Sequence, residues 1–132
     1  MAETGISLEG KRYILDVMFR GAEPVRQFWV GLARYPKGPE VTLAALTALE
    51  PVSGYARQVI FPLDWTIDKD SSIESRKISF ENIGKNTWPV VEVAFVATSK
   101  DGAGILLAWG PLDRSWALMP GDMLVVPLRI GF

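Results

Sequence analysis

The stretch VVEVAFVATSKDGAGILLAWGPL, residues 90–112, decides the fold class of this chain. It holds two runs of β-branched, aromatic and other apolar residues on either side of the pair Asp101-Gly102, a pattern typical of two antiparallel strands joined by a tight turn. A third apolar run, MLVV at residues 123–126, follows the turn residues Pro-Gly-Asp at 120–122. The stretch therefore predicts a β-hairpin that continues into a β-meander.

Short apolar runs of the same kind recur through the chain, separated by turn residues about every 8–12 positions. They predict a single domain, residues 1–132, that is mainly β and forms an antiparallel β-sandwich or jelly-roll-like barrel over residues 26–132. Residues 42–50 are expected to be an excursion with up to two helical turns, and the polar residues 64–77 a solvated loop. Pro127 predicts that the last strand lies at an edge or a bulge. The predicted strands cover residues 26–33, 54–61, 78–83, 90–98, 105–109, 116–119 and 123–130.

Residues 1–20 are predicted to form an N-terminal arm followed by a short helix. Leu15, Met18 and Phe19 lie at near-helical spacing, Ser7 or Thr4 suits the N-cap, and a glycine at position 21 ends the helix. Gly10 argues weakly against this helix. We expect the apolar stripe to pack partly on the protein's own sheet and partly on a neighbouring subunit. If residues 2–6 are an arm, their deletion should leave the β-domain folded and weaken attachment to a partner.

Composition removes several classes of function. The 132 residues contain no cysteine and no histidine, which excludes disulfides, thiolate metal sites and Ser-His or Cys-His nucleophile pairs. A formal net charge of −1 without a basic block predicts no nucleic-acid binding. No apolar stretch is long enough to span a bilayer, and the first residues do not resemble a signal peptide, so we expect a soluble product made in the cytoplasm.

The carboxylates give no pattern of a metal or catalytic site. Residues 68–74 place oxygen donors at alternate positions, but Ile73 and Ser79 stand where a calcium loop of the EF-hand type needs glycine and glutamate. No spacing singles out a pair of acidic residues for glycoside hydrolysis. We therefore expect no catalytic residue, no metal, no cofactor and no enzymatic activity.

Two kinds of residue are candidates for structural or interface roles. Of the five tryptophans, Trp109 is expected in the core or an interface, while Trp65 and Trp88 are the better candidates for exposed rings. Exposed coplanar rings would favour a carbohydrate-binding module, which is an alternative function. Arg57, two residues after Tyr55 in a predicted strand, needs a carboxylate or several carbonyls. We expect it to pin the strand within the domain, with a subunit or ligand contact as the alternative.

The hydrophobic fraction points to assembly. Forty-eight per cent of the residues are hydrophobic, which is more than a small core needs. We therefore expect part of the apolar surface to meet other subunits, in a homo-oligomer that is most simply a trimer.

Several short segments together resemble a known family, the small all-β bacteriophage virion proteins described as tail-fibre-like or head-decoration proteins. The resemblance implies a non-enzymatic structural protein located in the virion, on the capsid surface or the tail, and bound to the major capsid protein or other virion subunits. A capsid cement or decoration subunit is the first expectation, and a tail-fibre or baseplate accessory subunit is the alternative. Residues 51–54 are less rich in glycine than the family pattern, and the loop at residues 64–77 is longer. These differences leave undecided which virion surface the protein contacts. The segments that carry the resemblance are residues 19–21, 29–33, 42–44, 50–51, 53–58, 78–80, 88, 104–112, 120–122 and 124–130.

Overall fold

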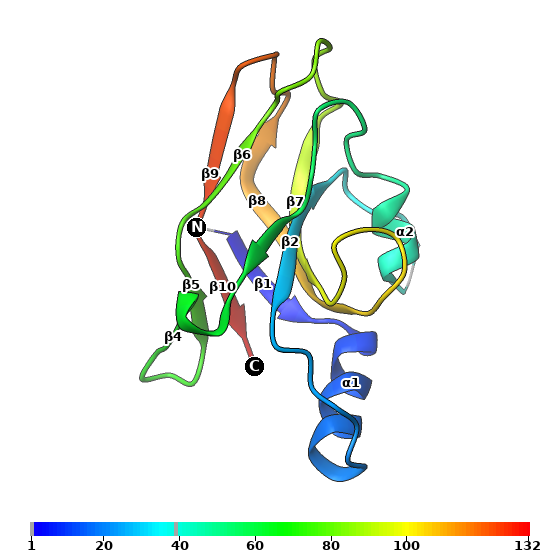
Figure 1. Ribbon diagram of the computed structural model, residues 1–132, viewed down its shortest axis with the longest axis vertical. Coiled ribbons are helices and arrows are strands. Elements are labelled where there is room, and N and C mark those ends of the chain that lie inside the picture. The colour runs from blue at the N-terminus through cyan, green and yellow to red at the C-terminus, as the bar shows by residue number, and fades with distance from the viewer. Residues whose placement is uncertain (1, 39) are drawn as a thin grey trace.

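The chain is mainly β with a short N-terminal helix, as the sequence predicts. A computed structural model describes residues 2–38 and 40–132 (Figure 1). Its strands are β1 (Ala2–Ile6), β2 (Phe28–Ala33), β3 (Gln58–Ile60), β4 (Trp65–Ile67), β5 (Ile73–Ser75), β6 (Ile78–Glu81), β7 (Val91–Ala97), β8 (Leu106–Trp116), β9 (Met123–Val126) and β10 (Leu128–Gly131). Its helices are α1 (Leu8–Phe19), α2 (Leu43–Thr47) and the 3₁₀ turn η1 (Pro62–Asp64).

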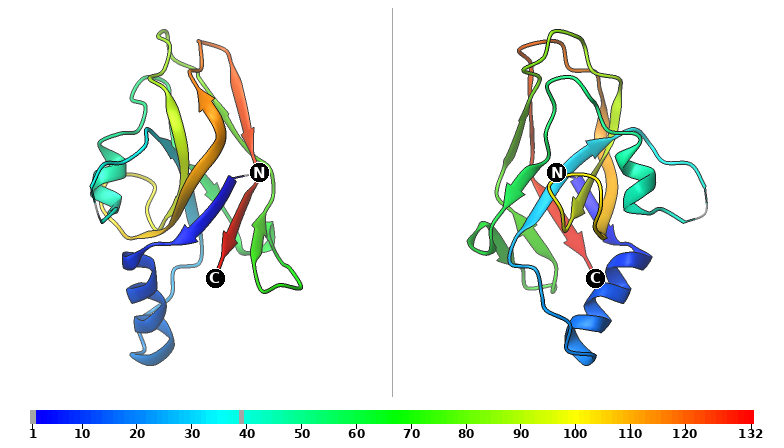
Figure 2. Two further views of the ribbon diagram at one scale, coloured as in Figure 1. Left: turned by 180° about the vertical axis from the view of Figure 1, so that it is seen from behind. Right: turned by 45° about the vertical axis from the view of Figure 1, so that its right-hand side comes forward.

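Eight strands form one curled sheet in the order β3-β2-β7-β8-β1-β10-β5-β4, a shape consistent with a sandwich or barrel-like fold (Figure 2). The sheet is not purely antiparallel, because β1 and β10 run parallel. Its two edge strands, β3 and β4, are connected by η1. Arg76 strengthens this connection by pairing with Asp64 at 3.2 Å and donating to the carbonyl of Val59 at 3.1 Å.

The remaining two strands, β6 and β9, pair with each other beyond the curled sheet. The predicted strand over residues 123–130 is therefore two strands, β9 and β10, which lie in different sheets and meet at Pro127. Proline has no N–H to donate to a ladder, so pairing changes partners there. Its carbonyl accepts a hydrogen bond from the N–H of Ala2 at 2.9 Å.

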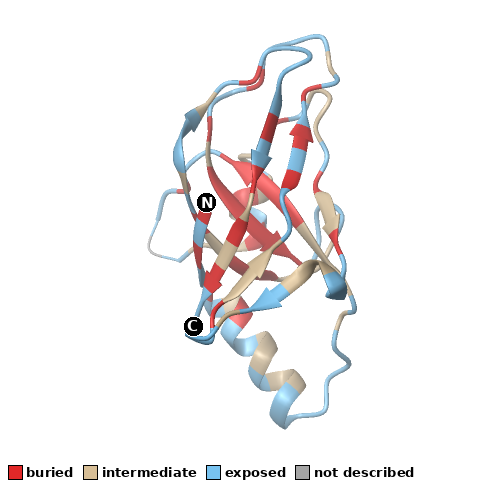
Figure 3. Cartoon of the chain, turned by 90° about the vertical axis from the view of Figure 1, so that its left-hand side faces the viewer, coloured by how far each residue is buried: buried red, intermediate tan, exposed pale blue. Residues whose placement is uncertain are grey.

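Residues 90–112 form the centre of the sheet, and both faces of β7 are buried. Figure 3 shows that the buried residues gather on strands inside the molecule. Ala94 and Val96 pack into the interior of the curl, whereas Val93 and Phe95 pack into a second cluster with α2. This explains the near-continuous apolar run, since a strand covered on both faces has no solvent side. The predicted strand at 105–109 is part of a longer strand, β8, which continues to Trp116, whereas residues 117–119 of the predicted strand at 116–119 are not in a strand.

Helix α1 begins and ends as the sequence predicts. The Ser7 side chain caps it by accepting from the N–H of Gly10 at 3.0 Å, and Gly21 follows the helix with φ of +75°. Gly10 is required rather than merely tolerated, because a Cβ there would lie 2.1 Å from the carbonyl oxygen of Leu107. Gly10 argues against a helix in the sequence, but in the structure it is the residue at which α1 contacts β8.

The prediction of an N-terminal arm is wrong. Residues 2–6 form β1, which lies inside the sheet between β8 and β10. Ala2 and Thr4 are buried there. Apart from Ile6, the residues of this strand are small or polar, so their sequence lacks the apolar alternation that marks a strand. Pairing with β8 and β10 on both sides holds them in the sheet.

Two further expectations need correction. Residues 64–77 are not simply a loop, since β4 and β5 form a hairpin at Asp68–Ser72 and Ser71 adopts a positive φ of 67°. The strand expected over residues 54–61 is limited to Gln58–Ile60, which leaves Tyr55 and Arg57 just outside it. Hydrogen bonds of their side chains hold these two residues in place instead.

The expected excursion over residues 42–50 contains the short helix α2, capped by Thr42.

Candidate interaction surfaces

The tryptophans do not form an exposed platform. The expectation for Trp88 is wrong, because it is only 3% exposed and its indole N–H donates to the carbonyl of Ser53 at 2.7 Å. Trp65 is half-buried and packs on the interior cluster. Trp109 packs on the cluster around α2, as expected of a core residue, with Tyr35 edge-on at 5.7 Å between ring centroids. All five tryptophans are buried or half-buried, so the feature that would favour a carbohydrate-binding module is missing.

Arg57 lies in a buried polar cluster of the kind expected for a structural arginine. It is 4% exposed, and its guanidinium donates to the Glu50 carboxylate, with the shortest contact at 2.7 Å. It also donates to the carbonyl of Ser99 at 3.0 Å and to the hydroxyl of Thr47 at 2.9 Å. The cluster ties the end of α2 to the loop between β7 and β8 and to the segment before β3. Arg57 thus links three separate segments of the chain.

Tyr55 extends this cluster to the sheet. Its hydroxyl donates to Glu50 at 2.5 Å and accepts from the backbone N–H of Leu32 at 2.9 Å. Burial, reinforced by the negative charge of Glu50, raises the pKa of Tyr55 well above its ordinary value of 10.0. The folded protein therefore retains this proton at a pH where tyrosine in the unfolded chain loses it.

This raised pKa predicts a loss of stability in alkali. As the pH rises above about 10, the unfolded chain releases a proton that folded Tyr55 keeps, so the free energy of unfolding falls by up to about 1.4 kcal/mol per pH unit. Urea unfolding between pH 9 and 11 measures this slope, and Tyr55→Phe should show a shallower one. Equal slopes in the two proteins would contradict the assignment.

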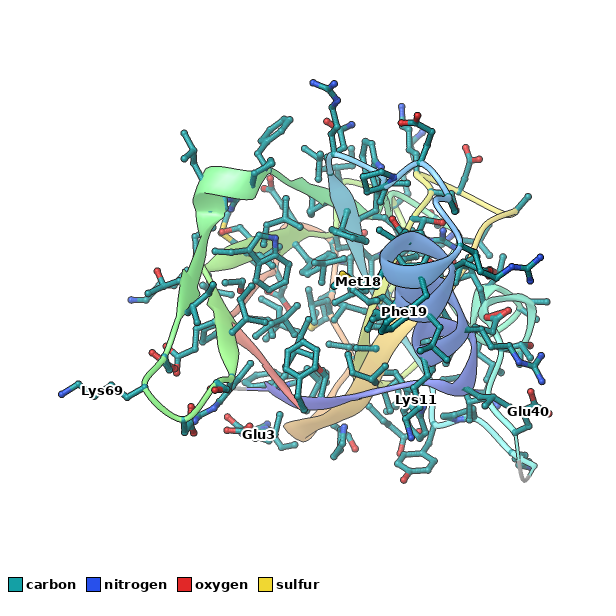
Figure 4. All side chains as sticks on the ribbon, turned by 90° about the horizontal axis from the view of Figure 1, so that it is seen from below. Glu3, Lys11, Met18, Phe19, Glu40 and Lys69 are labelled. Carbon is teal, nitrogen blue, oxygen red and sulfur yellow. The ribbon has the colours of Figure 1, made fainter. Side chains whose placement is uncertain are left out.

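Helix α1 exposes three large apolar side chains in its C-terminal half. Leu15, Met18 and Phe19 are 55%, 69% and 80% exposed. The helix projects beyond the sheet (Figure 1), and Figure 4 labels Met18 and Phe19 near its end. The expectation that this stripe packs partly on the protein's own sheet is wrong for these three residues. Gly10, Tyr13 and Ile14 make the contacts with the sheet instead.

A groove continues this surface toward the C-terminus. It has a volume of about 540 Å³ and is lined by Ile6, Ile14, Leu15 and Phe132, with Lys11 as the charged side chain. Phe132 is 79% exposed. We call Leu15, Met18, Phe19 and Phe132 the α1 surface. Sequence reasoning missed Phe132, because nothing in its local sequence distinguishes a terminal phenylalanine beside a helix from one in a frayed end.

A second cavity lies where the curled sheet opens, between the segment that enters β2, the β4–β5 hairpin and the end of β10. Its volume is about 740 Å³. We call it the sheet mouth. Its lining residues are Pro24, Val25, Arg26, Phe28, Pro62, Trp65, Ile67, Ile73, Leu107, Ile130 and Phe132.

The described residues show no grouping of three or more acidic side chains that is suited to a metal ion. The oxygen donors noted at residues 68–74 serve the hairpin turn, where Asp70 accepts from the N–H and the hydroxyl of Ser72. These bonds, the hydroxyl's first, lower the pKa of Asp70. Across residues 2–38 and 40–132, helices that are long and apolar enough to cross a membrane are absent.

Comparison with known proteins assigns no relative. No family model matches the chain, and no curated protein is significantly similar to it. The structural surfaces therefore carry the functional argument.

Proposed function

We propose that this protein is a non-enzymatic structural subunit that assembles with copies of itself through the α1 surface. The observation that carries the proposal is the exposure of Leu15, Met18 and Phe19 together on one short helix that projects from the sheet. Contiguous exposed apolar side chains of this kind mark interaction sites, because leaving them in water is unfavourable by about 25 cal/mol for each Å². A closed ring, most simply a trimer, would bury the same patch on every copy.

The setting we propose for this assembly is the bacteriophage virion, as a capsid cement or decoration subunit bound to the major capsid protein. The resemblance of the sequence segments to small virion proteins supports this setting. A subunit that binds only the assembled shell stabilises it by mass action, and several simultaneous contacts raise avidity without a strong single contact. A tail-fibre or baseplate accessory role is the alternative, and the genes next to its own distinguish the two: capsid genes favour cement, and tail genes favour the fibre.

The oligomeric state tests the α1 surface directly. We expect multi-angle light scattering at micromolar concentration to give the mass of an oligomer, and the variant Leu15→Gln/Met18→Gln/Phe19→Gln to give a monomer. The substituted side chains already face solvent, so the fold should tolerate glutamine and circular dichroism should be unchanged. The control, Val52→Gln/Ile83→Gln, replaces two exposed apolar residues away from α1 and should remain oligomeric. A monomeric wild-type protein that also fails to bind capsids would rule out the proposal.

A further inference from the structure

We propose that the sheet mouth binds a long-chain aliphatic carboxylate, with the chain against the apolar lining and the carboxylate on Arg26. Phe132 belongs to the α1 surface and also lines the mouth, but the inference does not depend on the assembly proposed above. Of the residues that line the mouth, Trp65 is a candidate from the sequence but Arg26 is not.

The mouth has the volume and the apolar lining of a small-molecule site. Of the residues that line it, Leu107 and Ile130 are buried, and Phe28, Trp65 and Ile73 are half-buried. A volume of about 740 Å³ falls within the range of about 300–1,000 Å³ that is usual for ligand pockets, and the mouth of a curled or closed sheet is a common place for them. Figure 4 shows this end of the sheet from below.

The positive charge of Arg26 at the rim of the mouth favours a ligand with an anionic head group. Arg26 is exposed and, within the described part of the chain, makes no hydrogen bond or ion pair. Arg76 and Arg129, by contrast, are each paired with carboxylates. None of the described residues that line the mouth is acidic. A carboxylate is the group that the planar guanidinium binds with two parallel hydrogen bonds, so an anionic head group complements the rim and a cationic one does not.

The lining requires an apolar tail. Apart from Arg26 and the indole N–H of Trp65, every side chain that lines the mouth is a hydrocarbon. The Trp65 N–H forms no hydrogen bond with the described residues. A sugar or a nucleotide would leave many polar groups without hydrogen bonds here, whereas an alkyl chain has no hydrogen bonds to water to lose.

Calorimetric titration of the full chain with octanoate, decanoate and dodecanoate, each below its micelle concentration, tests the proposal. Because each buried methylene contributes about 0.8 kcal/mol, the affinity should rise about threefold to fourfold for each added carbon. Dodecyltrimethylammonium, with the same tail and a cationic head, should bind more weakly than dodecanoate. The proposal is overturned if dodecanoate does not bind, if affinity is independent of chain length, or if the cation binds as tightly.

Two pairs of variants locate the site. Arg26→Gln should weaken dodecanoate by about fivefold, the size of one exposed charged contact, whereas Arg34→Gln at the other end of β2 should change nothing. Ile67 is 78% exposed at the rim, so both Ile67→Glu and Ile67→Lys should fold. We expect the glutamate variant to bind dodecanoate more weakly than the lysine variant. The assignment to the mouth is overturned if Arg26→Gln binds dodecanoate as tightly as Arg34→Gln and Ile67→Glu binds it as tightly as Ile67→Lys, because any binding would then lie elsewhere.

Discussion

Deletion of residues 2–6 should abolish cooperative folding. These residues are β1, an interior strand that pairs with β10 over four positions and with β8 over two. Their removal exposes two strand edges in the middle of the sheet and opens the interior cluster at Ala2. Each lost ladder bond costs about 1 kcal/mol, and the exposed core adds to this, so the total is comparable with the about 5–15 kcal/mol that holds a small domain together. Thermal unfolding followed by circular dichroism should show no sharp transition.

Two glycine substitutions test the same strand without deleting it. A Cβ on Gly110 of β8 would lie 2.0 Å from the carbonyl oxygen of Glu3 in β1, so Gly110→Ala should force the two strands apart and destabilise the protein strongly. A Cβ on Gly5 would meet nothing within 4 Å, so Gly5→Ala should have little effect. A truncated protein that melts like the intact chain would show that β1 is dispensable and restore the interpretation of residues 2–6 as an arm.

Arg57→Ala should destabilise the protein by about 3–5 kcal/mol. Removal of one member of a buried ion pair leaves the other charge without its partner, and here Glu50 would keep only the Tyr55 hydroxyl. The carbonyl of Ser99 and the hydroxyl of Thr47 also lose a donor. Urea unfolding at neutral pH measures the effect as a lower midpoint.

Arg129→Ala is the matched control for this prediction. Arg129 is also an arginine paired with carboxylates, Asp70 and Glu74, but all three side chains are partly exposed to solvent. Its removal should cost only about 1 kcal/mol or less. If Arg57→Ala leaves the unfolding midpoint unchanged and instead disrupts the oligomer, Arg57 is an interface residue.

Features of this protein that depend on neighbouring residues could be predicted from the sequence. The helix over residues 8–19 needs only a serine cap, a near-helical stripe and a glycine that accepts positive φ. The strands at 28–33 and 91–97 are equally local, because an apolar, β-branched run favours an extended chain. The requirement of Arg57 for a carboxylate or carbonyls also follows from its chemistry alone, although its partner Glu50 is known only from the fold.

The remaining features depend on contacts between residues far apart in the chain. Residues 2–6 become a strand because β8 and β10 offer two ladders, not because of their own side chains. The apolar stripe of α1 is exposed because the helix packs on β8 through its opposite face, at Gly10. Arg26, Trp65 and Ile130 line one cavity only because the sheet curls. The sequence by itself determined the mainly β class, the helix and the lack of histidine and cysteine chemistry, since these depend on residue type and local spacing. The tertiary structure alone decided which apolar residues meet solvent, because exposure depends on what the rest of the chain covers.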